Sequence, residues 1–505
     1  MSATANEDIH PHVYGNFAEP GRAGILGLSA GVSIALIPVV LLLFLFMATQ
    51  QFVLAIALVV VTSVGIALTK IKDREGRNFY ERRALKISQR RKERTQQHLY
   101  LAGPTGKGTP DGATRLPGLM ARSELTSQHD SFGQPFGLIR LSANDVHNYS
   151  VVFETHPEGE ALVDRDEMDR RVALWGAWLT QRGGDEGIRG ASVTIESSPD
   201  SGLRLNTLLD KNRAENSPEF AQTVSEQIRN SFQNGAPQLV ARITVTFSGK
   251  RLDGRTGDRG IEEMAEEIGN RLPTIRAALA GTGAGAVRAC TAQEITDFTR
   301  VAYDPTVATI VEEMQADGGT GLRWEDAGPA YARDNFDCYY HDRAVSKSWT
   351  MWEGPRGFFT DDSLKRVLAP LPGVLRKRVT LLYRPIPIDK TTQIVQAQQD
   401  NARFAKSQTR HSAVAQTRLA AANKTASEEA QGAGLTRFGV ILTITTDDAE
   451  DFNRWDRQVP GLFSRARLRV RPALANQAVT FQAGLPLGLV LPDHMLIPEE
   501  VREMF

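Results

Sequence analysis

The chain has 505 residues, which is more than one hydrophobic core usually organises, so two or three folded units are expected. Charged residues make up 23% and hydrophobic residues 41%, values ordinary for water-soluble globular material, which exclude a polytopic transporter. The formal net charge is zero, so we expect no direct nucleic-acid partner. Only two cysteines occur, Cys290 and Cys338, too few for a disulfide framework, and we expect reduced thiols facing the cytosol.

The N-terminal region predicts a membrane anchor. A polar tail, 1–22, precedes 23–69, which contains no charged residue. This stretch divides into one apolar run from Ile25 to Met47 and a second from Phe52 to Leu68, and each is long enough to cross a bilayer as a helix. The break between them is short, so we predict a hairpin of two antiparallel transmembrane helices. A signal peptide is excluded because the preceding tail is acidic and the first run is too long.

Residues 70–102 predict a basic helix at the membrane surface. Lys70 to Arg94 contains eleven Lys and Arg against four acidic residues, an excess of seven positive charges. The positive-inside rule places this flank, and with two crossings both termini, on the cytoplasmic side of the plasma membrane. We interpret these cations either as a lipid-headgroup surface or as solvated charges that only set topology. The residues are Lys70, Lys72, Arg74, Arg77, Arg82, Arg83, Arg90 and Arg91.

Residues 103–130 are rich in Gly, Pro and Thr and predict a linker. They include Lys107 in a Gly-Lys-Gly sequence, but the spacing is not that of a Walker loop, so we predict that the chain neither binds nor hydrolyses ATP. In 131–310, strand-like alternation and amphipathic helices interleave, and Thr291 with Glu294 forms a capping-box pattern. We predict a first cytoplasmic α+β domain of ferredoxin-like type.

Residues 311–505 predict a second cytoplasmic α+β half. Its most unusual segment is 391–431, rich in Ala, Gln, Lys and Arg with few Gly or Pro, which indicates a long arm made of one helix or a helical hairpin. A strand at 438–445 and a helix at 449–464 follow. Both halves end with strand, helix and strand, which is consistent with a duplicated unit, although no exact sequence repeat occurs.

No motif in the sequence argues for catalysis. The segment from Cys338 to Asp342 has the densest set of metal-ligand types, but zinc needs four ligands in recognisable pairs, so we interpret it as a buried structural segment. Hydrolase, zinc-protease and Walker-B patterns are absent from the sequence. We therefore predict no catalytic residues, no cofactor and no metal site.

The layout resembles a known family. The apolar hairpin with its basic exit, Arg22 to Arg94, resembles the small PrgI-type membrane subunit of Gram-positive conjugation systems. The α+β region is similar to the N-terminal, non-ATPase part of the type IV secretion assembly ATPase, which ends in a Leu-Pro-Leu-Gly-like turn, here within Phe481 to Gly488. Fusions of this build occur in actinobacterial conjugation-type loci. The resemblance does not extend to the motor domain and therefore implies no ATPase activity.

This resemblance implies a non-enzymatic inner-membrane scaffold that contacts membrane lipids, other membrane subunits and a separately encoded secretion-type ATPase. Homo-oligomerisation is left open. The alternatives are a membrane-anchored envelope enzyme using residues such as His341, Asp342 and Glu353, and a type VII secretion core subunit. We predict that the ATPase docks on the arm and the C-terminal tail, unless the tail is simply the last packed strand. The tail residues are Leu485, Pro486, Leu487, Gly488 and Leu491.

Overall fold

The architecture was obtained as a computed structural model. It describes residues 30–106, 111–143, 146–159, 163–185, 187–200, 202–214, 216–232, 237–251, 257–355, 360–408 and 413–495. The predicted tail at 1–22, Ile25 and Lys107 lie outside these residues.

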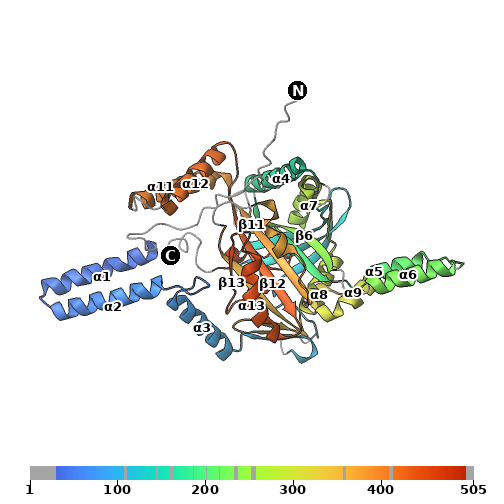
Figure 1. Cartoon of the computed structure of the whole chain (residues 1–505), viewed down its shortest axis with the longest axis horizontal. Coiled ribbons are helices and arrows are strands. Elements are labelled where there is room, and N and C mark those ends of the chain that lie inside the picture. Colours follow the sequence, from blue (N-terminus) through green and yellow to red (C-terminus); the bar gives the residue numbers. More distant parts are fainter. Residues whose placement is uncertain are drawn as a thin grey trace, which may run out of the picture.

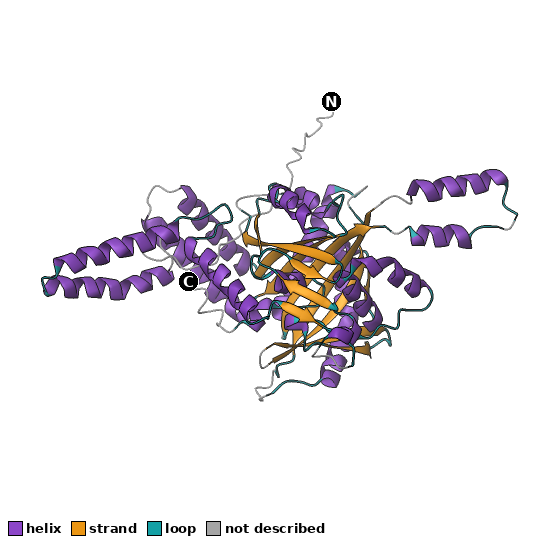
Figure 2. Cartoon of the chain, turned by 90° about the horizontal axis from the view of Figure 1, so that it is seen from below, coloured by secondary structure: helices purple, strands orange, loops and turns teal. Residues whose placement is uncertain are grey.

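Two apolar helices project from one end of the molecule. They are α1 (Ala30–Ala48) and α2 (Phe52–Lys70), which lie side by side as a hairpin (Figures 1 and 2). The basic helix α3 (Phe79–Arg94) follows and lies between this hairpin and the rest of the chain (Figure 1). We call α1 and α2 together the apolar hairpin.

The remaining described residues are organised around one antiparallel sheet of thirteen strands. The strands follow the path β1-β8-β9-β10-β12-β11-β5-β6-β4-β3-β2, with β13 added to β10 and β7 added to β4. Their bounds are β1 (Leu99–Leu101), β2 (Glu124–His129), β3 (Pro135–Ala143), β4 (Val146–His156), β5 (Ile188–Pro199), β6 (Pro237–Ser248), β7 (Ala286–Ala289), β8 (Tyr331–Asp334), β9 (Tyr339–His341), β10 (Ala344–Glu353), β11 (Arg376–Pro385), β12 (Thr436–Thr446) and β13 (Arg469–Pro472).

Helices cover both faces of the sheet. Their bounds are α4 (Arg165–Gly184), α5 (Leu203–Lys211), α6 (Glu219–Phe232), α7 (Ile261–Leu279), α8 (Ala292–Tyr303), α9 (Ala308–Ala316), α10 (Lys365–Leu368), α11 (Ile388–Gln408), α12 (Ala413–Ala430), α13 (Phe452–Leu462) and α14 (Gln477–Ala483). On one face, α4 and α7 pack over the β4, β5 and β6 region, and α10 and α13 pack over the β10, β11 and β12 region. Two separate apolar cores result on that face.

The opposite face carries a third core, which brings together strands that lie far apart in the strand order of the sheet. Ile139 of β3, Ala332 of β8 and Tyr339 of β9 share this core with Phe481 of α14. Strands near both ends of the path therefore curl toward the same cluster, and Figure 2 shows the resulting curved sheet. The C-terminal segment crosses this concave face.

Two groups of strands have the same connections and the same spatial order. The first runs β4-α4-β5-β6-α7-β7 and the second runs β10-α10-β11-β12-α13-β13. In each group the last strand pairs with the first, the first with the third, and the third with the second. The groups join where β5 pairs with β11.

A helical hairpin interrupts each group at the corresponding connection. Helices α5 and α6 lie between β5 and β6, and α11 and α12 lie between β11 and β12. We call these pairs the first arm and the second arm. They project toward opposite ends of the molecule, the second arm on the side of the apolar hairpin (Figures 1 and 2).

The structure confirms the predicted α+β class. Its strands form one large antiparallel sheet. The capping box at Thr291 and Glu294 is present at the start of α8. Of the two forms considered for 391–431, the structure has the helical hairpin, α11 and α12. Strands from both sides of residue 310 share one sheet. Within 103–130, where we predicted a linker, β2 joins that sheet and Leu116 and Met120 are buried in its third core.

Candidate functional site

The apolar hairpin exposes many large side chains to its surroundings. Phe44 is 69% exposed and Val53 is 82% exposed, as is usual for a surface that meets lipid or a partner rather than water. Among the described residues, the segment Phe52–Thr69 is long and apolar enough to cross a membrane, whereas Leu36–Ala48 is a shorter apolar stretch. The predicted membrane residues Met47 and Phe52 are exposed on the hairpin and Leu68 is half-buried.

A tight loop connects α2 to α3. The Asp73 carboxylate accepts hydrogen bonds from the backbone N–H groups of Glu75 and Arg77, each at 2.9 Å. Gly76 has a φ of +73°, and a Cβ there would lie 2.5 Å from the Trp352 ring of β10. The loop therefore requires glycine both for its backbone conformation and for its contact with the sheet.

Arg77 is not part of a headgroup surface, which corrects its inclusion among the predicted surface cations. It is 4% exposed, and its guanidinium donates to the Glu75 carboxylate and to the backbone carbonyl of Pro472 on β13. Burial lowers its pKa, and the Glu75 charge opposes that shift. Positive charge in a sequence cannot distinguish a surface cation from one that fastens a loop to a sheet, as Arg77 does. Whether this charge also sets topology stays a prediction.

Helix α3 is fastened to the sheet along one face. The Lys92 ammonium donates to the Asp334 carboxylate at 2.9 Å and to the Ala475 carbonyl at 2.6 Å. The buried Gln89 amide donates to the Asp334 backbone carbonyl at 3.0 Å. At the start of the helix, the Asn78 side chain caps the N–H of Glu81. We call residues 71–94 the junction, because these contacts hold α3 between the apolar hairpin and the sheet.

The other face of α3 is exposed and basic. A hollow in this surface is lined by Ile87, Arg90, Arg91, Arg94 and Thr95. Near the start of the helix, the Tyr80 hydroxyl oxygen lies 3.8 Å from where a Cβ would stand on Gly65 of α2, so α3 begins alongside the apolar hairpin. The predicted cations Lys72, Arg74, Arg82 and Arg83 are also exposed, and Lys70 ends α2.

The predicted docking residues of the C-terminal tail are mostly buried. Leu485 is 2% exposed and Leu487 is fully buried, and both belong to the third core. The Thr380 hydroxyl donates to the Gly484 carbonyl at 2.7 Å, and the Thr246 hydroxyl donates to the Gly488 carbonyl at 3.1 Å. The tail therefore crosses from β11 to β6 as a strap, residues 484–491, which includes Pro486 and Leu491. This arrangement favours the alternative in which the tail packs on the sheet.

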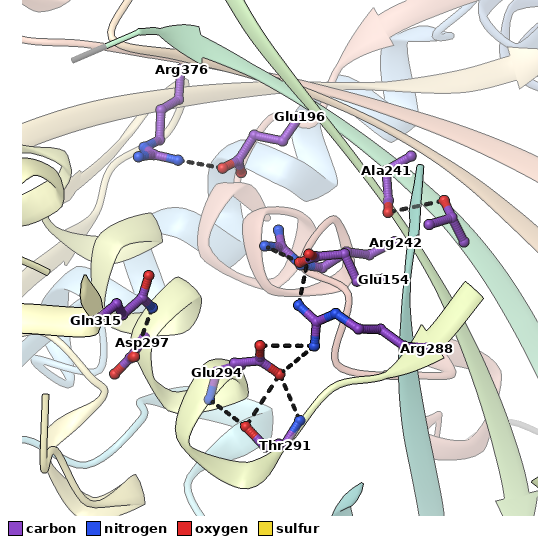
Figure 3. Close-up of polar contacts among 11 residues, drawn as sticks. Glu154, Glu196, Ala241, Arg242, Arg288, Thr291, Glu294, Asp297, Gln315 and Arg376 are labelled. Carbon is purple, nitrogen blue, oxygen red and sulfur yellow. Dashed lines mark hydrogen bonds and ion pairs between the residues drawn. The ribbon is translucent and has the colours of Figure 1, made fainter. Parts of the chain in front are cut away.

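An ion-pair network, which the sequence analysis missed, lies on the concave face of the sheet. Figure 3 shows Glu154 pairing with Arg242 and Arg288, and Arg288 reaching Glu294. Glu196 pairs with Arg376 and with Arg378 of the neighbouring strand. Burial alone would raise the pKa of Glu196, but the charges of Arg378, Arg376 and Arg242 lower it to about 2. Most of these partners lie far apart in the sequence, so no local motif signals the network.

The residues suggested for an envelope enzyme do not converge on one site. The His341 ring bonds the Tyr303 carbonyl and the Ser346 hydroxyl, whereas the Asp342 carboxylate accepts from Arg300 and from the backbone N–H of Ala330. Glu353 pairs with Arg469 on β13. Within the part of the chain that the structure describes, no group of three or more His, Cys, Asp or Glu is placed to hold a metal ion.

The N-terminal part of the chain is similar to a known protein family. Residues 21–81 match a family model described as Domain of unknown function (DUF8461). The match covers the whole apolar hairpin and extends into the start of α3. No curated protein matches the chain.

Proposed function

We propose that this protein is a non-enzymatic scaffold of a conjugation or type IV secretion-like machine, anchored in the plasma membrane and docking a separately encoded ATPase. The observation that carries the proposal is the junction. Arg77, Gln89 and Lys92 fasten the segment after α2 directly to the sheet, so the anchor and the cytoplasmic body are coupled without a flexible linker. Such coupling suits a subunit whose task is to hold partners at a fixed position relative to the membrane.

In this proposal both α1 and α2 cross the membrane, with the Thr49–Gln51 turn outside. The two helices are adjacent, and the exposed apolar side chains on both support a shared lipid environment. The basic residues of the junction then remain with both termini in the cytoplasm. Exposed Arg83, Arg90 and Arg91 face anionic headgroups, while Lys92 and Arg77 face the protein.

The cytoplasmic body consists, in our proposal, of two copies of one ferredoxin-like unit. The order of last, first, third and second strand in each group is that of a βαββαβ unit. Equivalent register positions also carry matching side chains. Ser150 lies opposite Thr246 with hydroxyls 3.0 Å apart, and Ser346 lies opposite Thr445 with hydroxyls 2.8 Å apart. Val287 and Arg288 of β7 occupy the same register positions in the first group as Val470 and Arg471 of β13 occupy in the second.

A pseudo-twofold axis would then pass through the β5/β11 pairing. Thr194 and Thr380 lie directly opposite each other there, with their hydroxyls 3.2 Å apart. They are equivalent positions of the two units, each within a Val-Thr-aliphatic sequence. This symmetry explains why the two arms leave the sheet at opposite ends.

The first arm is the surface we assign to ATPase docking. It projects on the side opposite the apolar hairpin, and so into the cytoplasm under this proposal (Figures 1 and 2). Phe220 on α6 is 80% exposed and Leu208 on α5 is 58% exposed. The buried strap residues do not offer a comparable surface.

Topology and partner identity test the proposal together. A phosphatase fused after Phe505 should be inactive because it stays in the cytoplasm, whereas the same reporter inserted at Gln50 should be active. Purification of the native membrane complex should recover an ATPase encoded by another gene. An active C-terminal phosphatase, or a complex that contains no ATPase, would contradict the scaffold function.

A further inference from the structure

The second arm lies on the same side of the molecule as the apolar hairpin. In both views its free end reaches the level of the base of that hairpin along the long axis, while the first arm points the other way (Figures 1 and 2). If the apolar hairpin crosses the membrane, as the proposed function holds, this free end stands at the membrane surface. The inference below rests on that part of the proposed function.

The second arm is a defined pair of helices rather than a loose extension. Thr392 donates to Glu429 at 2.8 Å near the base, and the Gln399 and Asn423 side chains bond at 3.4 Å further along. Val395 is only 3% exposed. The free end is therefore presented by two helices that support each other.

Charge differs between the base and the free end of the second arm. The described free end contains Arg403, Lys406 and Arg418 and a single acid, Asp400, which gives three positive charges against one negative charge. The Arg403 side chain is 62% exposed although it pairs with Asp400 at 3.6 Å. Acidic Glu428 and Glu429 lie toward the base instead.

An exposed aromatic residue accompanies this positive end. Phe404, one turn before the end of α11, is 46% exposed. An aromatic side chain among cations is the combination that binds the interface of an anionic bilayer, because the ring enters the headgroup region and the cations meet phosphates. The positive charge of the free end and its position beside the apolar hairpin both favour anionic lipid as its binding partner, rather than a basic or neutral protein surface.

We propose that the free end of the second arm is a second membrane contact, in which Phe404 enters the headgroup region and Arg403, Lys406 and Arg418 bind the phosphate groups of anionic lipids. The first arm, inserted at the equivalent connection, stays in water. The two arms thus serve different partners, although they occupy equivalent positions in the two strand groups.

Site-specific labelling of the full chain tests this contact. The two native cysteines, Cys290 and Cys338, are buried, so a single introduced cysteine can be labelled. Three exposed serines provide matched positions: Ser63 on α2, Ser225 on the first arm and Ser407 on the second arm. Each Ser→Cys variant carries an environment-sensitive fluorophore and is reconstituted into vesicles of phosphatidylcholine with or without phosphatidylglycerol.

In vesicles with phosphatidylglycerol, a quencher carried on lipid should quench the labels at 63 and 407 but not at 225, and aqueous iodide should quench only the label at 225. In the Ser407→Cys background, Phe404→Ser or the pair Arg403→Glu and Lys406→Glu should reduce lipid quenching to the level at 225. The matched change Lys390→Glu at the base should not.

The outcomes separate this inference from the function on which it rests. If the label at 63 reports lipid but the label at 407 is as accessible to iodide as the label at 225, the second membrane contact is wrong and the anchor stands. If the label at 63 is itself exposed to water, the anchor and the proposed scaffold function fail together.

Discussion

His341 illustrates how burial decides the role of a residue that the sequence leaves open. The residue is fully buried, its Nδ1 bonds the Tyr303 carbonyl at 2.6 Å, and its Nε2 bonds the Ser346 hydroxyl at 2.7 Å. Ser346 in turn bonds Thr445 at 2.8 Å. A histidine enclosed in this way connects β9 to β10 and β12.

This burial predicts a pH-dependent stability. Burial lowers the pKa of His341 to about 4, compared with an ordinary value of 6.5. Between these values the unfolded chain binds a proton that the folded chain excludes, so stability is full above pH 6.5 and falls as the pH drops toward 4. The loss amounts to roughly 3 kcal/mol. Denaturant unfolding at several pH values measures it.

The His341→Gln variant isolates this contribution from that of the carboxylates. It should be less stable at pH 7 by about 1–3 kcal/mol, because the buried bonds to Tyr303 and Ser346 are disturbed. Its stability should then decline less steeply than that of the wild type between pH 6.5 and 4. Parallel pH profiles for the two proteins would show that the buried ring does not control the decline.

Among the elements, the strap depends on one glycine. Gly488 has a φ of +76°, and a Cβ there would lie 2.0 Å from the Ser150 hydroxyl and 2.5 Å from the Thr246 hydroxyl. The strap can cross the sheet at this point only because the residue lacks a side chain. The same contact places its carbonyl within reach of Thr246.

Gly488→Ala should therefore lift the strap from β4 and β6. Backbone strain and steric overlap together should destabilise the chain by about 2–4 kcal/mol, measured as a shift in denaturant midpoint. Gly373→Ala is the matched control, because Gly373 has a similar φ of +74° but nothing within 4 Å of its Cβ position. Equal effects of the two substitutions would mean that only the backbone angle, not the close approach, matters at 488.

Local patterns predicted several elements because their signals lie within one segment. The capping box at Thr291 and the strand predicted at 438–445 correspond to α8 and β12. Strand β2 carries mostly polar residues, so no alternation marks it, and it is held by pairing with β3 instead. Likewise, nothing near Lys92 indicates that its partner is Asp334, since that contact joins positions 242 residues apart.

At the scale of the whole molecule, each arm is an insertion between two strands that pair with each other directly. Pro199 at the end of β5 lies directly opposite Pro237 at the start of β6. Pro385 and Thr436 occupy the corresponding places around the second arm. Each pair of strands could thus be joined by a short hairpin turn.

Replacement of residues 200–236 by Asn-Gly should give a protein that folds with its sheet intact and remains in the membrane. Circular dichroism and the membrane fraction check folding. Recovery of the ATPase in a pull-down should be abolished, because Phe220 and Leu208 are removed. The matched control replaces 386–435 and should retain the ATPase. Full recovery by the first variant would move the docking surface elsewhere on the body.

The two-unit organisation that we propose is largely hidden in the sequence. The matching positions are single Ser, Thr, Val and Arg residues in short strands, while the arms and the connections differ in length and composition. Strand register makes the correspondence visible, because the pairing of Ser150 with Thr246 in the first group recurs as the pairing of Ser346 with Thr445 in the second. The sheet face on which these hydroxyls lie cannot be read from composition alone.

The pairing of β5 with β11 also affects how the chain is made. Glu196 and its partner Arg378 are 182 residues apart, so β5 leaves the ribosome long before the strand that covers its edge. At about 5–20 residues per second, the delay is on the order of ten to forty seconds. During that interval an uncovered strand edge invites pairing with another nascent chain. Synthesis of this protein should therefore depend on holding chaperones, or on insertion of its apolar hairpin, to keep neighbouring polysome products apart.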